Sequence, residues 1–437
     1  MIRRLVALAA AAALVAQVGL SGCAGGAEQD VVTVLGPWTG SEEVAFRRVL
    51  DDFQATTGFT ARYEGTRAQN QVLRGDLQQG APPDVAVLSN PAELARYAHS
   101  GELRPLDTVL GAEATTAYSP QWLRLQRLGT GSVYAVAVKA DLKSMVWYDP
   151  RVVARPEPST WDELVSTSRA LTAAGRTPWC LGMGAPPNSG FPGTDWVEDI
   201  LLHTAGPRAY RDWAAGGLAW TDPAVRAAWQ RWGDLVLPPG AVRGGAAAAL
   251  LTTFADAGQA MVADPPGCAM DHLGSFAING YADARRDGGS ARPDTDFDFF
   301  PFPGAGDRGP SEVAADLAGM FRDTPGARAL MAYLASERGQ RVWPSDGTTF
   351  SVHQRLVDQD LYRTDVGRRI ARTLARGAEL CFDASDLMPS AMSSAFYQAV
   401  LEYLAHPDRL DTLLAELDRV RAGVDPRHWL DLPCGTT

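Results

Sequence analysis

Short apolar runs alternate with helix-like segments at the beginning of the chain, and this alternation constrains the fold more than any other feature of the sequence. The runs at 31–35 and 84–88 are rich in valine and leucine, as expected for strands that are buried on both faces. Apolar residues then recur at helical spacing from Ser41 to Thr57 and again after Pro91. The repetition of strand and helix predicts an α/β fold with a doubly wound, mostly parallel sheet.

Polar and aromatic side chains follow two of these predicted strands. Trp38 and Thr39 come after the first run, and Ser89 and Asn90 come after the run at 84–88. Ligands of doubly wound sheets bind beyond the carboxyl ends of the strands, so we expect these four side chains at a binding site. Asn90 also precedes a proline, which predicts that it caps the next helix.

The chain is predicted to cross to a second domain between residues 133 and 158. Two apolar strands, near 133–138 and 145–148, flank the charged stretch 139–143. A break rich in proline then precedes a predicted helix start at Ser159-Thr160. Lys143 lies at this crossover, which makes it a candidate ligand contact.

The rest of the chain is predicted to be mostly helical. Aspartate alternates with threonine and phenylalanine over 294–299, which predicts a half-buried strand. Apolar spacing predicts helices over 354–376, 392–404 and 409–421. A Gly-x-Gly-x-x-Gly match at 304–309 is bracketed by prolines and no helix start follows it directly, so we expect no dinucleotide site there.

Residues 179–199 join a loop to a helix start and carry side chains suited to a polyhydroxylated ligand. Glycine and proline are dense in the first part of the segment and then stop, which predicts a helix N-terminus. The rings of Phe191 and Trp196 can stack on sugar C–H groups, and the carboxylate of Asp195 can accept from sugar hydroxyls. Asp195 and Glu198 also have the spacing of a capping box, so a structural role for Asp195 as a helix cap remains an alternative.

The first 22 residues have the layout of a secretory signal. Arg3 and Arg4 precede an apolar run that ends at Leu20 and is shorter than the ~20 residues of a spanning helix. We therefore expect residues 1–22 to be a signal peptide.

Leu20-Ser21-Gly22-Cys23 resembles the bacterial lipobox, whose cysteine receives a diacylglycerol. Two acyl chains on Cys23 give a stable membrane anchor, and the following residues to position 30 have the composition of a flexible tether. We expect a lipoprotein held at the extracytoplasmic face of the cell membrane. An ordinary secreted protein with an incidental cysteine is the alternative.

The charge balance excludes nucleic acid as a partner. The chain has 51 acidic and 40 basic residues, a net charge of −11, and loss of the two N-terminal arginines makes the balance more acidic. No basic stretch remains to contact phosphates.

Four cysteines remain beyond Cys23: Cys180, Cys268, Cys381 and Cys434. An even number in an oxidising compartment predicts two disulfides, and the residues alone leave all three pairings open. The cysteine spacings do not match zinc sites and the six histidines are scattered, so we expect neither a metal nor a cofactor.

Motifs spread along nearly the whole mature chain carry a resemblance to a known family. In order, they are Pro83-Asp84-Val85, Ala98-His99-Ser100-Gly101-Glu102-Leu103, Pro158-Ser159-Thr160-Trp161-Asp162-Glu163-Leu164, and Met388-Pro389 with Ser394-Ala395-Phe396-Tyr397. With these motifs the chain resembles the extracellular solute-binding proteins of ABC sugar importers, the family of maltose-binding protein.

A narrower resemblance is to the alpha-glucoside-type binding proteins of that family. It rests on four segments: Lys143-Ser144-Met145-Val146-Trp147-Tyr148, Trp179-Cys180-Leu181-Gly182, residues 192–199, and residues 382–389. This resemblance implies that Cys180 pairs with Cys268, which leaves Cys381 for Cys434. Two positions depart from the group: Phe191 stands where it usually shows tryptophan, and Cys268 is followed by Ala-Met instead of an aromatic residue.

The resemblance implies a periplasmic-binding-protein fold of two α/β domains, joined by hinge strands, with a ligand cleft between them. The first lobe would comprise 31–140 and about 311–352, and the second would comprise 141–310 and about 353–437 with the C-terminal helices. Asp383, Phe396 and Tyr397 join the candidate ligand contacts on the same grounds.

The function implied by the resemblance is that of a substrate-binding component rather than an enzyme. The lobes would close around an extracellular sugar, and the loaded monomer would dock on the permease subunits of an ABC transporter.

Two alternative functions can be considered for the same residues. An extracellular glycoside hydrolase needs a pair of carboxylates across a cleft, but the spacing of Asp195, Glu198, Asp383 and Asp386 singles out no pair. A lipoprotein that senses sugars or supports the envelope would have the same fold and no permease.

Overall fold

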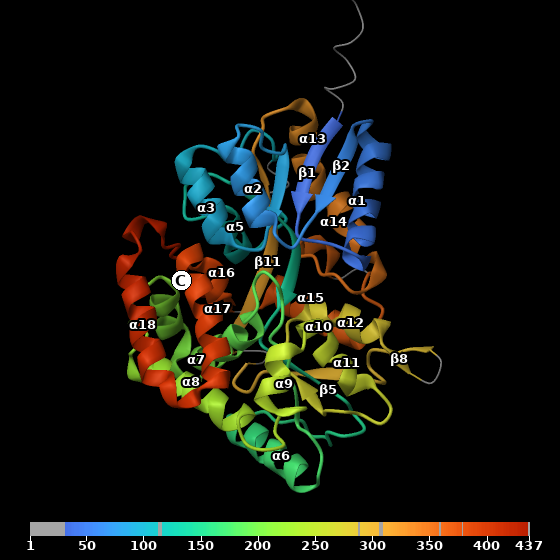
Figure 1. Cartoon of the computed structure of the whole chain (residues 1–437). Coiled ribbons are helices and arrows are strands. Elements are labelled where there is room, and N and C mark those ends of the chain that lie inside the picture. Colours follow the sequence, from blue (N-terminus) through green and yellow to red (C-terminus); the bar gives the residue numbers. More distant parts are fainter. Residues whose placement is uncertain are drawn as a thin grey trace, which may run out of the picture.

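The computed structural model describes residues 31–111, 116–286, 289–305, 309–357, 360–377 and 379–435. The predicted signal peptide, Cys23 and the predicted tether lie outside these residues. The described chain forms two α/β lobes, one above the other in Figure 1, with strands running between them.

The upper lobe of Figure 1 is built from alternating strands and helices, followed by the long strand β4. In chain order these are β1 (Val31–Gly36), α1 (Ser41–Thr57), β2 (Thr60–Gly65), α2 (Gln69–Gln78), β3 (Val85–Leu88), α3 (Pro91–Ser100), α5 (Pro120–Gln126) and β4 (Ala135–Leu142). The chain returns to this lobe later with β11 (Ser311–Met320), α13 (Pro325–Ala335) and α14 (Glu337–Val342).

The lower lobe contains most of the helices. Its first part comprises β5 (Met145–Tyr148), α6 (Trp161–Ala173), β6 (Trp179–Cys180), α7 (Phe191–Ala214), α8 (Pro223–Val236), α9 (Gly245–Leu251), α10 (Phe254–Ala257), α11 (Gln259–Val262), β7 (Met270–Asp271), α12 (Ile278–Asp283), β8 (Arg285–Arg286), β9 (Gly289–Ser290) and β10 (Asp298–Pro301). The C-terminal part comprises α15 (Asp365–Arg376), β12 (Leu380–Phe382), α16 (Ala384–Leu387), α17 (Ser390–Ala405) and α18 (Leu410–Gly423).

Strand β11 connects the two lobes through hydrogen bonds on both of its edges. Antiparallel β4 covers one edge from Val313 to Gly319. The other edge is shared by antiparallel β3 near Leu317–Met320 and parallel β12 near Ser311–Val313. Residues 314–316 of β11 therefore lie between the ends of β3 and β12, at the junction of the lobes. Beyond β3 the sheet continues with parallel β1 and β2.

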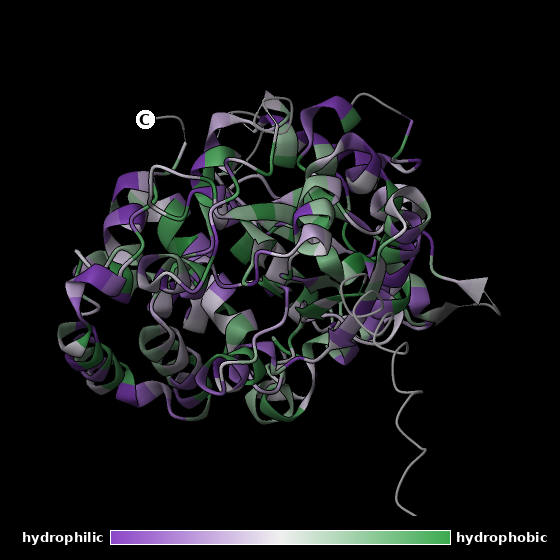
Figure 2. Ribbon diagram, turned by 90° about the horizontal axis from the view of Figure 1, so that it is seen from above, coloured by the Kyte–Doolittle hydropathy of each residue, from purple (hydrophilic) through white to green (hydrophobic). Residues whose placement is uncertain are grey.

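Alternating side chains of this sheet enter two separate cores, because successive residues of a strand point to opposite faces. On β3, Val85 and Val87 pack with the core beneath α1 and α13, whereas Ala86 and Leu88 pack with the core beneath α2 and α3. Figure 2 shows hydrophobic residues mainly inside the molecule and hydrophilic residues mainly on the outer faces of the helices. The predicted strands at 31–35 and 84–88 and their two-sided burial are thus confirmed.

The lower lobe has its own sheet, in the order β10-β5-β7-β6. Helices α7, α8, α17 and α18 pack together beside it around buried tryptophans such as Trp213 and Trp229. The disulfide Cys180–Cys268 links β6 to the segment before β7, and Cys381–Cys434 ties the C-terminal segment to β12. Both predicted pairings are confirmed.

The structure corrects the predicted cap at Asp195. Helix α7 begins at Phe191 with Gly190 as its N-cap, so Asp195 lies inside the helix, after its first turn. The turn at Gly190 and a proline in the first turn start the helix five residues earlier than the capping-box spacing suggested. Asn90, by contrast, caps α3 as predicted, since its side chain accepts from the backbone N–H of Glu93.

Three other segment predictions were partly wrong. The stretch 139–142 belongs to β4 and does not interrupt it, because pairing with β11 continues as far as Leu142. The strand predicted from residue 294 begins only at Asp298, since Asp294 turns the chain and accepts from the backbone N–H groups of Asp365 and Val366. The helix predicted from residue 354 begins at Asp365, because Thr364 is its N-cap and accepts from the backbone N–H of Gly367.

Candidate ligand-binding site

A cavity of about 620 Å³ lies between the two lobes. The upper lobe lines it with the loops after β1 and β3, and the lower lobe lines it with the start of α7, with α10 and with the segment after β12. The middle of β11 and the end of β4 form its back. Its size lies within the range of known sites for small molecules.

Eight of the eleven predicted ligand contacts line this cavity: Trp38, Thr39, Ser89, Lys143, Phe191, Asp195, Asp383 and Tyr397. The other three lie elsewhere. Asn90 caps α3. Trp196 is 1% exposed and packs against Trp179 and His272, whose ring centroids lie 4.9 and 4.3 Å away. Phe396 is fully buried among the tryptophans of α7 and α8. Both aromatic rings face the core because their helices present other residues, Phe191 and Tyr397, to the cavity.

Lys143 is the central cation of the lower half of the site. Its Nζ lies 2.7 Å from Oδ2 of Asp195 and 3.1 Å from Oδ2 of Asp383. Burial lowers the pKa of Lys143, but the two carboxylates outweigh it, and the pKa stands well above its ordinary value. Burial raises the pKa of Asp195 to about 6 although Lys143 opposes the shift. For Asp383, burial is outweighed by Lys143 and by Ser385, so the pKa of that carboxyl is lowered.

A second buried cation, Lys139, organises the upper half. Its Nζ lies 3.1 Å from Oε1 of Glu42 and 3.6 Å from Oδ2 of Asp141. Asp316 of β11 completes this group, because it accepts hydrogen bonds from the indole of Trp38 at 3.0 Å and from the hydroxyl of Ser89. Asp316 thus fixes the two loops that the sequence predicted at the carboxyl ends of β1 and β3.

Three phenylalanines form an apolar wall beside Lys143, whose Nζ lies 5.5 Å from the ring centroid of Phe191 and 5.7 Å from that of Phe276. The ring centroid of Phe191 lies 5.1 Å from that of Phe254 and 6.2 Å from that of Phe276. All three rings are only partly buried and line the cavity. A cavity lined by both aromatic rings and carboxylates can bind a polyhydroxylated molecule.

Sequence reasoning missed several lining residues, among them Glu42, Lys139, Asp141, Phe254, Phe276 and Asp316. One signal was available: Lys139, Asp141 and Lys143 alternate with apolar residues, which is the spacing of one strand face. The others depend on which strand lies next to β11 and on loop conformation, and the sequence pattern does not encode these.

The family model described as bacterial extracellular solute-binding protein matches residues 36–341. The chain belongs to this family. Among the described residues of the solute-binding protein, no helix has both the length and the apolar character needed to span a membrane.

Relatives and a solved structure agree with the assignment. The solute-binding protein is 35% identical over 399 residues to the osmoprotective compounds-binding protein GgtB of Synechocystis sp., covering 90% of this chain and 93% of that protein. It is 32% identical over 394 residues to the alpha-glucosides-binding periplasmic protein AglE of Rhizobium meliloti, covering 87% and 84%. The structure of maltose-bound MalE3 of T. maritima has the same fold, with a TM-score of 0.68, 15% identity, and coverage of 90% and 99%.

The family assignment confirms the predicted two-lobe fold and the predicted class of function. Its members are extracellular binding proteins of ABC transporters, so the solute-binding protein captures its ligand and is not an enzyme. The glycoside hydrolase considered from the sequence is not supported.

Proposed function

We propose that the solute-binding protein captures a neutral glucoside in the cavity between its lobes and delivers it to the permease of an ABC sugar importer. The presence of three phenylalanines and several buried carboxylates in one cavity supports this proposal most directly. The names of AglE and GgtB, an alpha-glucosides-binding and an osmoprotective compounds-binding protein, favour a small glucoside.

The charges of the cavity favour a ligand without negative charge. Seven acidic residues line it, Glu42, Asp141, Asp195, Asp283, Asp316, Asp383 and Asp386, against three basic ones, Arg67, Lys139 and Lys143. Lys139 and Lys143 are already paired with carboxylates. A uronate or a sugar phosphate would therefore meet net repulsion, whereas hydroxyl groups can donate to the carboxylates.

We propose the eight cavity-lining residues of the sequence prediction as ligand contacts, and we add Phe254 and Phe276. The lobe boundaries proposed are those expected from the sequence, with 31–140 and about 311–352 in one lobe and 141–310 and about 353–437 in the other. Because the contacts come from both lobes, ligand binding favours the closed arrangement over an open one.

Calorimetric titration of the purified protein with neutral α-glucosides tests the proposal. We expect trehalose, sucrose or maltose to bind, and a glucuronide or glucose phosphate of similar size to fail. Phe254→Ala removes one ring of the wall and should weaken binding about tenfold. Binding of the anionic sugars alone would contradict the proposed ligand class.

We further propose that Cys23 carries a lipid anchor and that the protein acts as a monomer at the extracytoplasmic face of the membrane. The lipobox-like sequence Leu20-Ser21-Gly22-Cys23 supports the anchor. Cys23→Ala should move the protein from the membrane fraction to the soluble fraction, and its retention in membranes would contradict the anchor.

A further inference from the structure

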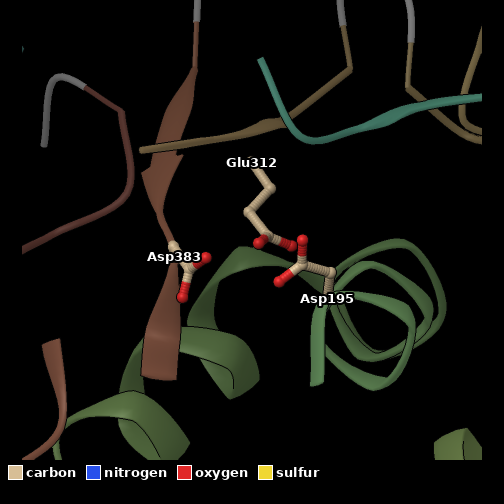
Figure 3. A group of neighbouring side chains, drawn as sticks. All are labelled: Asp195, Glu312 and Asp383. Atoms are coloured by element: carbon tan, nitrogen blue, oxygen red, sulfur yellow. The ribbon is translucent and has the colours of Figure 1, made fainter. Parts of the chain in front are cut away.

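Three carboxyl groups converge beneath the cavity from different parts of the chain. Asp195 comes from α7, Glu312 from β11 and Asp383 from the residue after β12, and Figure 3 shows their carboxyl groups directed toward one another. One oxygen of each lies within 4.8 Å of the others. The three residues are at most 2% exposed.

Glu312 is the member whose charge is least compensated. Both of its carboxyl oxygens are buried and, among the described residues, neither has a hydrogen-bond partner. Oδ1 of Asp195 is likewise buried without a partner, while its Oδ2 contacts Lys143. A buried carboxylate oxygen without a partner costs folding free energy, so such a group needs either a proton or a cation.

The nearby basic groups do not balance this cluster. Lys143 supplies one positive charge, which Asp195 and Asp383 share. His272 and His203 both contact Asp199, one helical turn along α7 from Asp195, and neither forms an ion pair with Glu312 among the described residues. Glu198, one further buried carboxyl, adds to the excess of acid.

We propose that Asp195, Glu312 and Asp383 bind a calcium ion at the base of the ligand cavity. The donor set consists of oxygen atoms alone, which is the preference of hard divalent cations. Calcium fits better than magnesium, because magnesium retains several waters and this site is almost closed to solvent. Asp195 and Asp383 also line the cavity, so a ligand hydroxyl or water can reach the ion from that side.

The ion would hold three elements in one arrangement. It would tie α7 and the segment after β12 to the N-terminal half of β11, the strand that connects the lobes. Lys143 and the ion can both contact Asp195. Lys143 uses Oδ2 of that carboxylate, and Oδ1 has no hydrogen-bond partner among the described residues.

Metal content and thermal unfolding of the sugar-free protein test this proposal independently of the glucoside assignment. Protein treated with a chelator should bind one calcium ion per chain, and saturating calcium should raise its melting temperature by about 4 °C. Glu312→Gln, which keeps the shape but removes the charge, should abolish both effects. Asp271→Asn, a buried acid of the lower lobe that lies outside the cluster and the cavity, should retain them.

If protons rather than a calcium ion neutralise the three carboxyl groups, the same measurements give different results. The wild-type protein would then show no calcium response, and Glu312→Gln would be as stable as the wild type or more stable; this result would overturn the proposal. A calcium response that persists in Glu312→Gln would also overturn it, because the ion would bind elsewhere. If Glu312→Gln does not fold, the calcium stoichiometry of the wild type and of Glu312→Asp decides: one ion in the wild type with weaker binding in the variant supports the site, and equal binding or none refutes it.

Discussion

Residues at the ends of strands could be placed from the sequence, whereas charged residues inside strands could not. Trp38 and Ser89 follow buried strands, and the general geometry of doubly wound sheets puts such residues at the ligand. Glu312 and Asp316 stand within β11, and which of them faces the cavity depends on where β3 ends and β12 begins. That arrangement is a tertiary property, and the short apolar pattern around these residues does not reveal it.

The two aromatic residues predicted on α7 should separate binding from stability. Phe191 lines the cavity, so Phe191→Ala should weaken glucoside binding about tenfold and change the melting temperature little. Trp196 is core, so Trp196→Ala should lower the free energy of unfolding by about 3–5 kcal/mol. Calorimetric titration and thermal unfolding of both variants check this, and equal losses of stability would contradict the assigned positions.

Asp271 should make stability depend on pH. It is buried in β7, where it accepts from the hydroxyl of Tyr281 at 2.8 Å, and burial raises its pKa from 3.8 to about 7 despite that hydrogen bond. Because the folded state holds this proton more tightly, the stability from Asp271 is complete below about pH 4 and is lost as the pH rises to about 7. Asp271→Asn should remove this loss and raise stability at pH 8 by on the order of 2–4 kcal/mol.

Asp52 provides a control of opposite sign. Hydrogen bonds from Arg338 and Tyr333 lower the pKa of this partly buried carboxyl from 3.8 to about 2. Its contribution is therefore lost as the pH falls from about 4 toward 2. Urea unfolding across the pH range should show Asp52→Asn differing from the wild type at neutral pH, with the difference fading only in acid. A pH profile of Asp271→Asn identical to that of the wild type would contradict the assignment of Asp271.

At the scale of elements, the sequence predicted the start of a helix correctly where a capping side chain marks that start. Asn90 and the Thr160–Glu163 pair cap α3 and α6 as their spacing suggests. The start of α7 was misplaced because its N-cap is a glycine without a capping side chain, and Asp195, five residues later, has the spacing of a cap. A side chain at Gly190 is excluded by the backbone of Tyr397 in α17, a tertiary contact that no local pattern contains.

Gly190 should therefore tolerate no side chain. Its φ is 110°, and a Cβ atom there would lie 2.3 Å from the carbonyl oxygen of Tyr397. Gly190→Ala should cost more than about 2 kcal/mol and should weaken ligand binding, since the shift displaces Tyr397 at the cavity. Gly40, with φ 63° and open space around it, isolates the backbone effect, so Gly40→Ala should cost only about 1–2 kcal/mol. Thermal unfolding of the two variants compares them, and an equal cost would show that the contact with Tyr397 is unimportant.

The whole molecule depends on contacts that cross between its lobes outside the cavity. Helix α3 of the upper lobe meets α16 and α17 of the lower lobe, and there the hydroxyl of Ser390 donates to Oε1 of Glu93. Neither residue lines the cavity. A contact of this kind stabilises the closed arrangement without touching the ligand, so it contributes to affinity only through the equilibrium between open and closed lobes.

Ser390→Ala should reduce glucoside affinity about two- to tenfold, the loss expected for one hydrogen bond that forms on closure. Ser394→Ala, an exposed serine of the same helix, should bind as the wild type does. In small-angle scattering, the ligand should decrease the radius of gyration of the wild type, and Ser390→Ala should need more ligand to reach the same compact form. If the radius of gyration did not change on binding, or if Ser390→Ala bound with unchanged affinity, the lobes would not close through this contact, and selectivity would have to arise within a preformed cavity alone.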